Sequence, residues 1–95
     1  MTETQIKILS NAVQTYGKNA QVDKAIEEMA ELTKALLKER HNNGSVDDII
    51  EEIADVYIMI SQLCLIFEAG LSADEFVDYK IERLERRLKQ KEELK

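Results

Sequence analysis

Four carboxylates, arranged in two pairs, are the residues of this sequence best placed to do chemistry. Glu28 and Glu31 stand three apart in one segment, and Glu52 and Asp55 stand three apart in another. Residues three apart lie on the same side of a helix, so each pair presents two carboxylates together. The two pairs are nearly equidistant from the intervening turn, which places them at about the same level of an antiparallel helix pair. We therefore expect all four groups to converge.

Four converging carboxylates beside an apolar helix face require compensation, since packed like charges raise pKa values and cost stability. Divalent cations usually supply it, and oxygen ligands suit Mg²⁺, with Mn²⁺ as an alternative. A di-iron site is disfavoured because the single histidine, His41, does not follow a glutamate by three residues. The competing interpretation is a solvated charged face, which is the commoner outcome for an isolated Glu-x-x-Glu.

A basic stripe in the last segment is the second candidate feature. Lys80, Arg83 and Arg87 border an apolar stripe at spacings of three and four residues. Each one alone is explained by surface charge paired with neighbouring glutamates. Together, in a protein of net charge −6, they predict a clamp for phosphate groups.

Helices must position these groups, because a chain of 95 residues with three glycines and no proline lacks the turns of a β fold. Three glycine-containing breaks divide it, and Ser45 and Ser72 are placed to cap the helices that follow. We expect one domain, residues 1–95, with an all-α four-helix bundle. Its helices are expected at about 3–15, 20–40, 46–68 and 73–93.

The third expected helix predicts an oligomer. Beyond Val56 it is apolar on nearly every side, and such a helix must be buried on every side. Four helices of this length can hardly enclose one of their own so completely. Burial of its second apolar face between subunits would cover the apolar surface that one chain cannot enclose.

Composition and the length of the apolar runs limit the partners and the cellular location that we expect. The acidic balance argues against nucleic acid as a partner. The most apolar run, residues 56–67, is too short to span a membrane. The first residues lack the apolar stretch of a signal peptide, and the single cysteine, Cys64, excludes an internal disulfide. We expect a cytoplasmic protein.

The acidic motifs resemble those of the MazG-type all-α nucleoside triphosphate pyrophosphohydrolases. The matching segments are Glu28-Met-Ala-Glu31-Leu and Glu51-Glu52-Ile-Ala-Asp55-Val-Tyr, followed by a lysine and an arginine on the last helix. The likeness covers roughly residues 20–88.

The resemblance implies an Mg²⁺-dependent enzyme, usually a homodimer or homotetramer. Such an enzyme hydrolyses ribo- or deoxynucleoside triphosphates to the monophosphate and pyrophosphate. The four acids would be its catalytic metal ligands, and one of them or a neighbour such as Glu27 or Glu51 would orient the attacking water. Lys80, with Arg83 or Arg87, would contact the phosphates.

Two alternatives stay open. A specialised pyrophosphohydrolase, such as one acting on phosphoribosyl-ATP, would have the same fold. A non-catalytic helical adaptor or regulatory oligomer would need no active site, and its acids would be surface charge.

Overall fold

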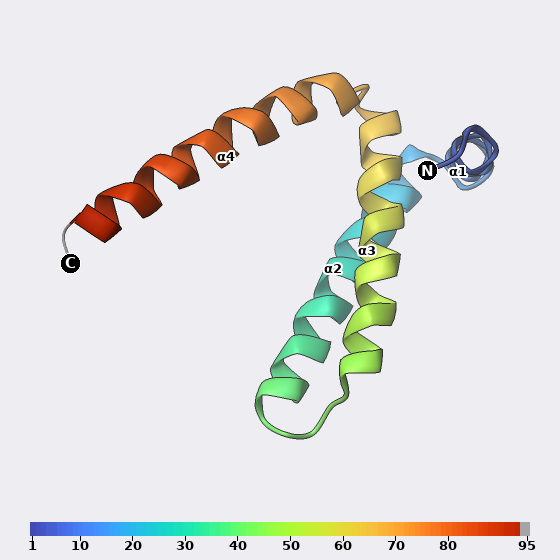
Figure 1. Ribbon diagram of the computed structural model, residues 1–95. Coiled ribbons are helices and arrows are strands. Elements are labelled where there is room, and N and C mark those ends of the chain that lie inside the picture. Colours follow the sequence, from blue (N-terminus) through green and yellow to red (C-terminus); the bar gives the residue numbers. More distant parts are fainter. Residues whose placement is uncertain (94–95) are drawn as a thin grey trace.

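The computed structural model describes residues 1–93, which form four α-helices joined by short connections (Figure 1). This part of the chain contains no strand, so the all-α, four-helix prediction is confirmed. Every helix boundary falls within three residues of the expected one. The helices are α1 (Glu3–Tyr16), α2 (Lys18–Arg40), α3 (Val46–Ile66) and α4 (Gly70–Glu93).

Side-chain caps fix where two of the helices begin. Thr2 and Gln5 form a reciprocal capping box at the start of α1. The Ser45 hydroxyl accepts a hydrogen bond from the Asp48 backbone N–H at 3.2 Å, as expected for the cap of α3. The expected cap at Ser72 is wrong, because α4 already begins at Gly70 and Ser72 lies within its first turn.

Residues with a positive φ angle turn the chain between helices. Gly17, with φ 93°, ends α1. The two later turns place this conformation at Asn42 and Glu68, with φ of 63° and 50°, rather than at a glycine. The turn after α2 nevertheless favours a glycine at Gly44, since a Cβ there would approach the Lys38 Cβ and the Glu39 backbone nitrogen at 3.0 Å.

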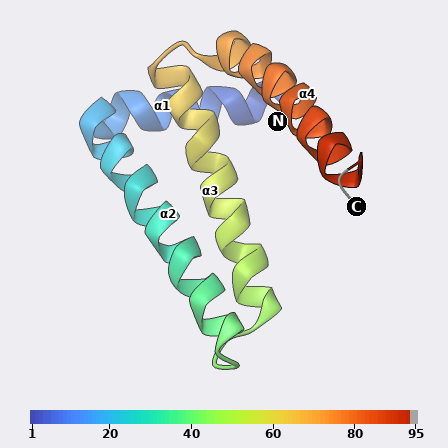
Figure 2. The ribbon, with the colours of Figure 1, turned by 90° about the vertical axis from the view of Figure 1, so that its left-hand side faces the viewer.

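The α2–α3 pair is an antiparallel hairpin and forms most of the tertiary packing, while α1 lies across its open end (Figures 1 and 2). The most buried residues stand where these helices meet: Ala25 on α2, and Met59 and Gln62 on α3. Ala25 allows close approach of the backbones. This hairpin carries the acidic residues.

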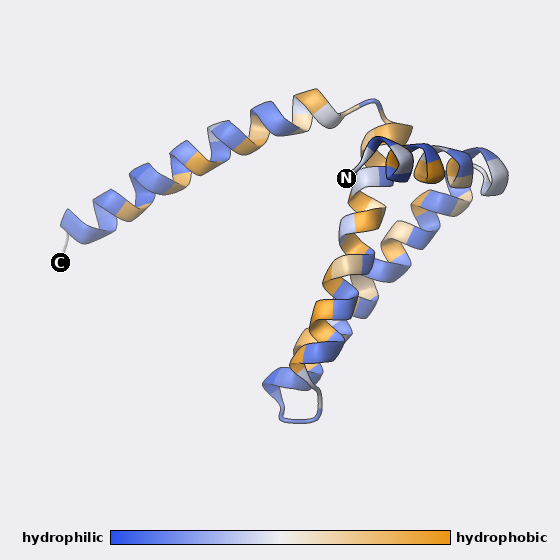
Figure 3. Ribbon diagram, turned by 45° about the vertical axis from the view of Figure 1, so that its right-hand side comes forward, coloured by the Kyte–Doolittle hydropathy of each residue, from blue (hydrophilic) through white to orange (hydrophobic). Residues whose placement is uncertain are grey.

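The fourth helix does not complete a bundle within one chain. It contacts only α3, from which it turns away by 119° (Figure 1). Its apolar residues recur along an exposed face, as Figure 3 shows. The radius of gyration is 17.0 Å, against about 12 Å for a compact domain of this length. The expected four-helix bundle is therefore formed only in part, because α3 and α4 leave large apolar faces uncovered.

No single helix within residues 1–93 is long and apolar enough to cross a membrane. Only α3 and α4 taken together, across their bend, meet that requirement by length and composition.

Candidate metal centre

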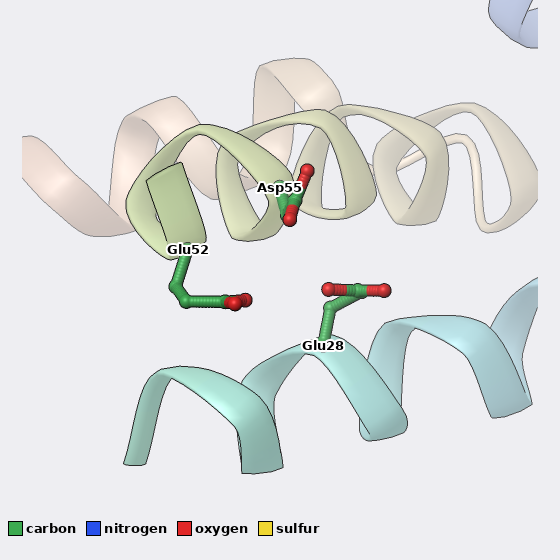
Figure 4. Close-up of side chains that lie close together, drawn as sticks. All are labelled: Glu28, Glu52 and Asp55. Carbon is green, nitrogen blue, oxygen red and sulfur yellow. The ribbon is translucent and has the colours of Figure 1, made fainter. Parts of the chain in front are cut away.

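Three of the four carboxylates meet between α2 and α3. Glu28 projects from α2 toward Glu52 and Asp55 on α3, as Figure 4 shows. Each offers an oxygen within 4.8 Å of one offered by each of the other two, and all three side chains are partly buried. The hairpin register places them at one level. The expected convergence of the two acidic pairs is thus present for these three groups, which we call the acidic triad.

The fourth acid, Glu31, lies beside the acidic triad and is exposed. It lines a pocket together with Glu52, one turn along α2 from Glu28. Its charge acts on Glu52 even though its carboxylate is not part of the triad. Glu31 is therefore placed to contact a ligand at the edge of the acidic triad.

Glu52 is the group whose environment is least favourable for a bare carboxylate. Desolvation by burial raises its pKa, and the charges of Asp55, Glu28, Glu31 and Glu51 raise it further. Its Oε2 atom is buried and has no hydrogen-bond partner among residues 1–93. A buried carboxylate oxygen without a partner, facing two other carboxylates, is an arrangement that a cation would stabilise.

One lysine partly compensates the acidic triad. Lys24 Nζ lies 3.1 Å from Glu28 Oε1 and 3.7 Å from Glu27 Oε1. The hydrogen bond to Glu28 and both glutamate charges raise the pKa of Lys24. This lysine was not predicted, although its spacing of four from Glu28 was a usable signal. A metal ion at the triad would compete with Lys24 for Glu28.

Two other features were not predicted. Lys34 and Lys38 line the pocket beside Glu31, and their spacing of three and seven residues from that glutamate was the available signal. Gln62 is 97% buried, and its Oε1 has no partner among the described residues. A single amide within an apolar run was the signal for that position.

The basic residues of α4 do not reach the acidic triad of their own chain. Lys80, Arg83 and Arg87 follow α4 away from the hairpin, and α4 contacts neither α1 nor α2 (Figure 1). The guanidinium carbon of Arg83 lies 5.9 Å from the centre of the Tyr79 ring on the same helix. The sequence-predicted basic stripe and the acidic triad are therefore not brought together within one chain.

The donor set of the site fits a hard divalent cation. Its ligand atoms are carboxylate oxygens, which Mg²⁺ and Mn²⁺ prefer, and no histidine or cysteine is among them. Three protein carboxylates leave coordination positions for water and phosphate oxygens, as is usual for Mg²⁺ bound with a nucleotide. The unpartnered Glu52 Oε2 is the atom of this set that most needs such an ion.

No family model matches the chain, and no curated protein or solved structure is significantly similar to it. The function must therefore be inferred from the chain's own residues and their geometry.

Proposed function

We propose that this protein is an Mg²⁺-dependent nucleoside triphosphate pyrophosphohydrolase, with Mn²⁺ as a possible substitute. The observation that carries the proposal is the acidic triad, whose oxygens lie within 4.8 Å of one another and include the unpartnered Glu52 Oε2. The MazG-type spacing of the acidic residues supports the same reaction class. Glu28, Glu52 and Asp55 would hold the ion, with Glu31 at its edge.

The reaction adds water to the α-phosphorus and breaks its bond to the oxygen that bridges to the β-phosphate. Pyrophosphate leaves with the electron pair of that bond, and the water loses a proton. A bound divalent ion supplies charge neutralisation and polarises the phosphate. Glu28, Glu52 and Asp55 would hold that ion, and their fixed positions on α2 and α3 would orient it toward the phosphates. Glu27 and Glu51, which neighbour the ligands on their helices, are the candidates to orient the water and take its proton.

A second copy of the chain completes this proposal. Residues 80–91 hold six basic and two acidic residues, whereas α3 holds five acidic residues and no lysine or arginine. This complementarity favours packing of α4 from one chain near α3 of another. In such a homodimer or homotetramer, Lys80 and Arg83 or Arg87 would contact phosphates at the partner's acidic triad. The apolar stripe of α4 would be covered by the same contact.

A non-catalytic adaptor is the alternative that one observation favours, namely the large apolar faces of α3 and α4. Such a protein needs no metal. It would gain stability whenever the repulsion among the triad carboxylates is removed, and Mg²⁺ would not change its melting temperature.

Pyrophosphate release from a panel of ribo- and deoxynucleoside triphosphates tests the proposal, with Mg²⁺, Mn²⁺ or chelator present. We expect metal-dependent release of pyrophosphate together with the monophosphate. Glu52→Gln and Asp55→Asn should each lower the rate at least about 100-fold, because removing even an indirect partner of a metal ligand costs 10–100-fold. Glu39→Gln, an exposed change at the far end of α2, is the matched control and should retain the rate.

Thermal melting separates the two functions independently of turnover. Mg²⁺ at about 100 times its dissociation constant stabilises the native state by about 2.7 kcal/mol, or roughly 10 °C or more for a domain of this size. The shift should disappear in Glu52→Gln. No shift in the wild-type protein, combined with no pyrophosphate release, would favour the adaptor.

A further inference from the structure

A pocket of about 150 Å³ opens beside the acidic triad, at the end of the hairpin that carries the α2–α3 turn. It shares Glu52 with the triad and Glu31 with its edge, so a ligand held by the triad can extend directly into it. The remaining wall comes from the end of α2, the turn and the start of α3. These lining residues are Lys34, Ala35, Lys38, Gly44 and Asp48.

Two lysines form a row of positive charge that runs from the acidic triad toward the α2–α3 turn. Glu31, Lys34 and Lys38 are spaced by three and four residues, so they share one face of α2 and descend from the acids toward the turn. The ion pairs among residues 1–93 involve only Lys24 and Lys89. Neither pocket lysine is therefore bound to a carboxylate of the described residues, and both are placed to bind a ligand.

The charge balance of the pocket depends on a cation at the triad. Its lining carries three carboxylates and two ammonium groups, so without metal the balance is acidic. One divalent ion on the acids reverses the sign. A polyanion then meets a cation at one end of the pocket and two lysines at the other, whereas metal-free protein repels it.

The turn holds this pocket in shape. Gly44 lies so close to the end of α2 that a Cβ would meet Lys38 at 3.0 Å, and the Asn43 backbone N–H donates to the Lys38 carbonyl at 2.8 Å. The backbone at Lys38 is thereby tied to the turn. Its side chain starts from a fixed point at the pocket wall.

We propose that this pocket binds the β- and γ-phosphates of the triphosphate, and inorganic pyrophosphate after the reaction, with Lys34 and Lys38 as the contacts. The assignment rests on the proposed function and adds a direction to it. The leaving pyrophosphate lies toward the α2–α3 turn, and the nucleoside lies toward α1. These lysines would act on the acidic triad of their own chain, whereas the basic residues of α4 are proposed to act on the triad of a partner chain.

Calorimetric titration with inorganic pyrophosphate tests the pocket without any turnover. Wild-type protein should bind pyrophosphate in Mg²⁺ and not in chelator. It should bind orthophosphate more weakly, because one phosphate cannot span the ion and both lysines. Lys34→Gln/Lys38→Gln should weaken pyrophosphate binding at least about tenfold, since hydrogen bonds to charged groups are the stronger ones. Lys34→Arg/Lys38→Arg should retain binding.

The matched control is Lys7→Gln/Arg40→Gln, which removes the same charge from exposed positions outside the pocket. It should bind pyrophosphate like the wild type. The pocket variant should keep its helicity and its Mg²⁺-induced melting shift while the KM for triphosphate rises.

Equal pyrophosphate affinity in the pocket variant and the control would overturn the assignment. If the wild type still hydrolyses triphosphates in that case, only this inference fails. Wild-type protein that neither hydrolyses triphosphates nor binds pyrophosphate in Mg²⁺ would overturn the proposed function and this inference with it.

Discussion

The uncovered apolar face of α4 leads to a quantitative prediction about assembly. The accessible surface of the chain is 7878 Å², whereas a compact protein of its mass exposes about 5,600 Å². The excess of about 2,300 Å² per chain, doubled for two chains, is in the range of obligate homodimer interfaces. We therefore expect the protein to be oligomeric at micromolar concentration.

Two substitutions on α4 should dissociate this oligomer. Ile81 and Leu84 are 59% and 50% exposed, so covering the rest of each side chain contributes about 1 kcal/mol. A symmetric dimer buries both residues twice, for a total of about 4 kcal/mol. Ile81→Asp/Leu84→Asp should therefore raise the dissociation constant by about 1,000-fold, and desolvation of the new carboxylates should raise it further.

Sedimentation or light scattering over a concentration series measures the effect. Ser72→Asp/Gln90→Asp is the matched control, because it adds two carboxylates to the same helix on the side opposite Ile81. The control should remain oligomeric while the stripe variant shifts to monomer. A monomeric wild type, or a stripe variant with the control's dissociation constant, would refute the reasoning.

Two further predictions concern the acidic triad. Since the pKa of Glu52 is raised above its ordinary 4.5, the metal-free native state binds this proton more tightly than the unfolded chain. The contribution of Glu52 to stability is therefore greatest below its ordinary pKa of 4.5 and is lost as the pH rises through the raised pKa. Glu52→Gln should flatten this decline in thermal melts with chelator, and an unchanged pH profile would contradict it. Mixing inactive Glu52→Gln with inactive Lys80→Ala/Arg83→Ala should restore pyrophosphate release if the cations act on the partner's triad; no recovery after verified subunit exchange would place them elsewhere.

Helix positions were predictable because their signals are local. The Ser45 cap and the 3.6-residue periodicity define α3 whatever packs around it. The start of α4 was placed three residues late, because Ser72 offers a capping pattern that the chain does not use. Instead, the Ala73 backbone N–H donates to the Ala69 carbonyl at 2.8 Å, which extends the helix back to Gly70.

The convergence of the carboxylates was predictable from the hairpin, since residues on antiparallel helices face one another at positions set by the turn. The separation of Glu31 from Glu28, Glu52 and Asp55 was not, because spacing alone does not fix how far a side chain reaches around the helix. The direction of α4 was also not predictable from the sequence. It depends on the short connection at Glu68, whose positive φ no periodicity encodes.

The partial bundle has a consequence for how this protein reaches its working form. Its packing joins mostly elements that neighbour one another along the chain, so the α2–α3 hairpin can form early and rapidly. In the proposed oligomer, coverage of α4 would instead require a collision between two chains and would follow second-order kinetics. The rate of that step would then depend on the expression level, and newly made chains would expose the apolar face of α4 until they associate.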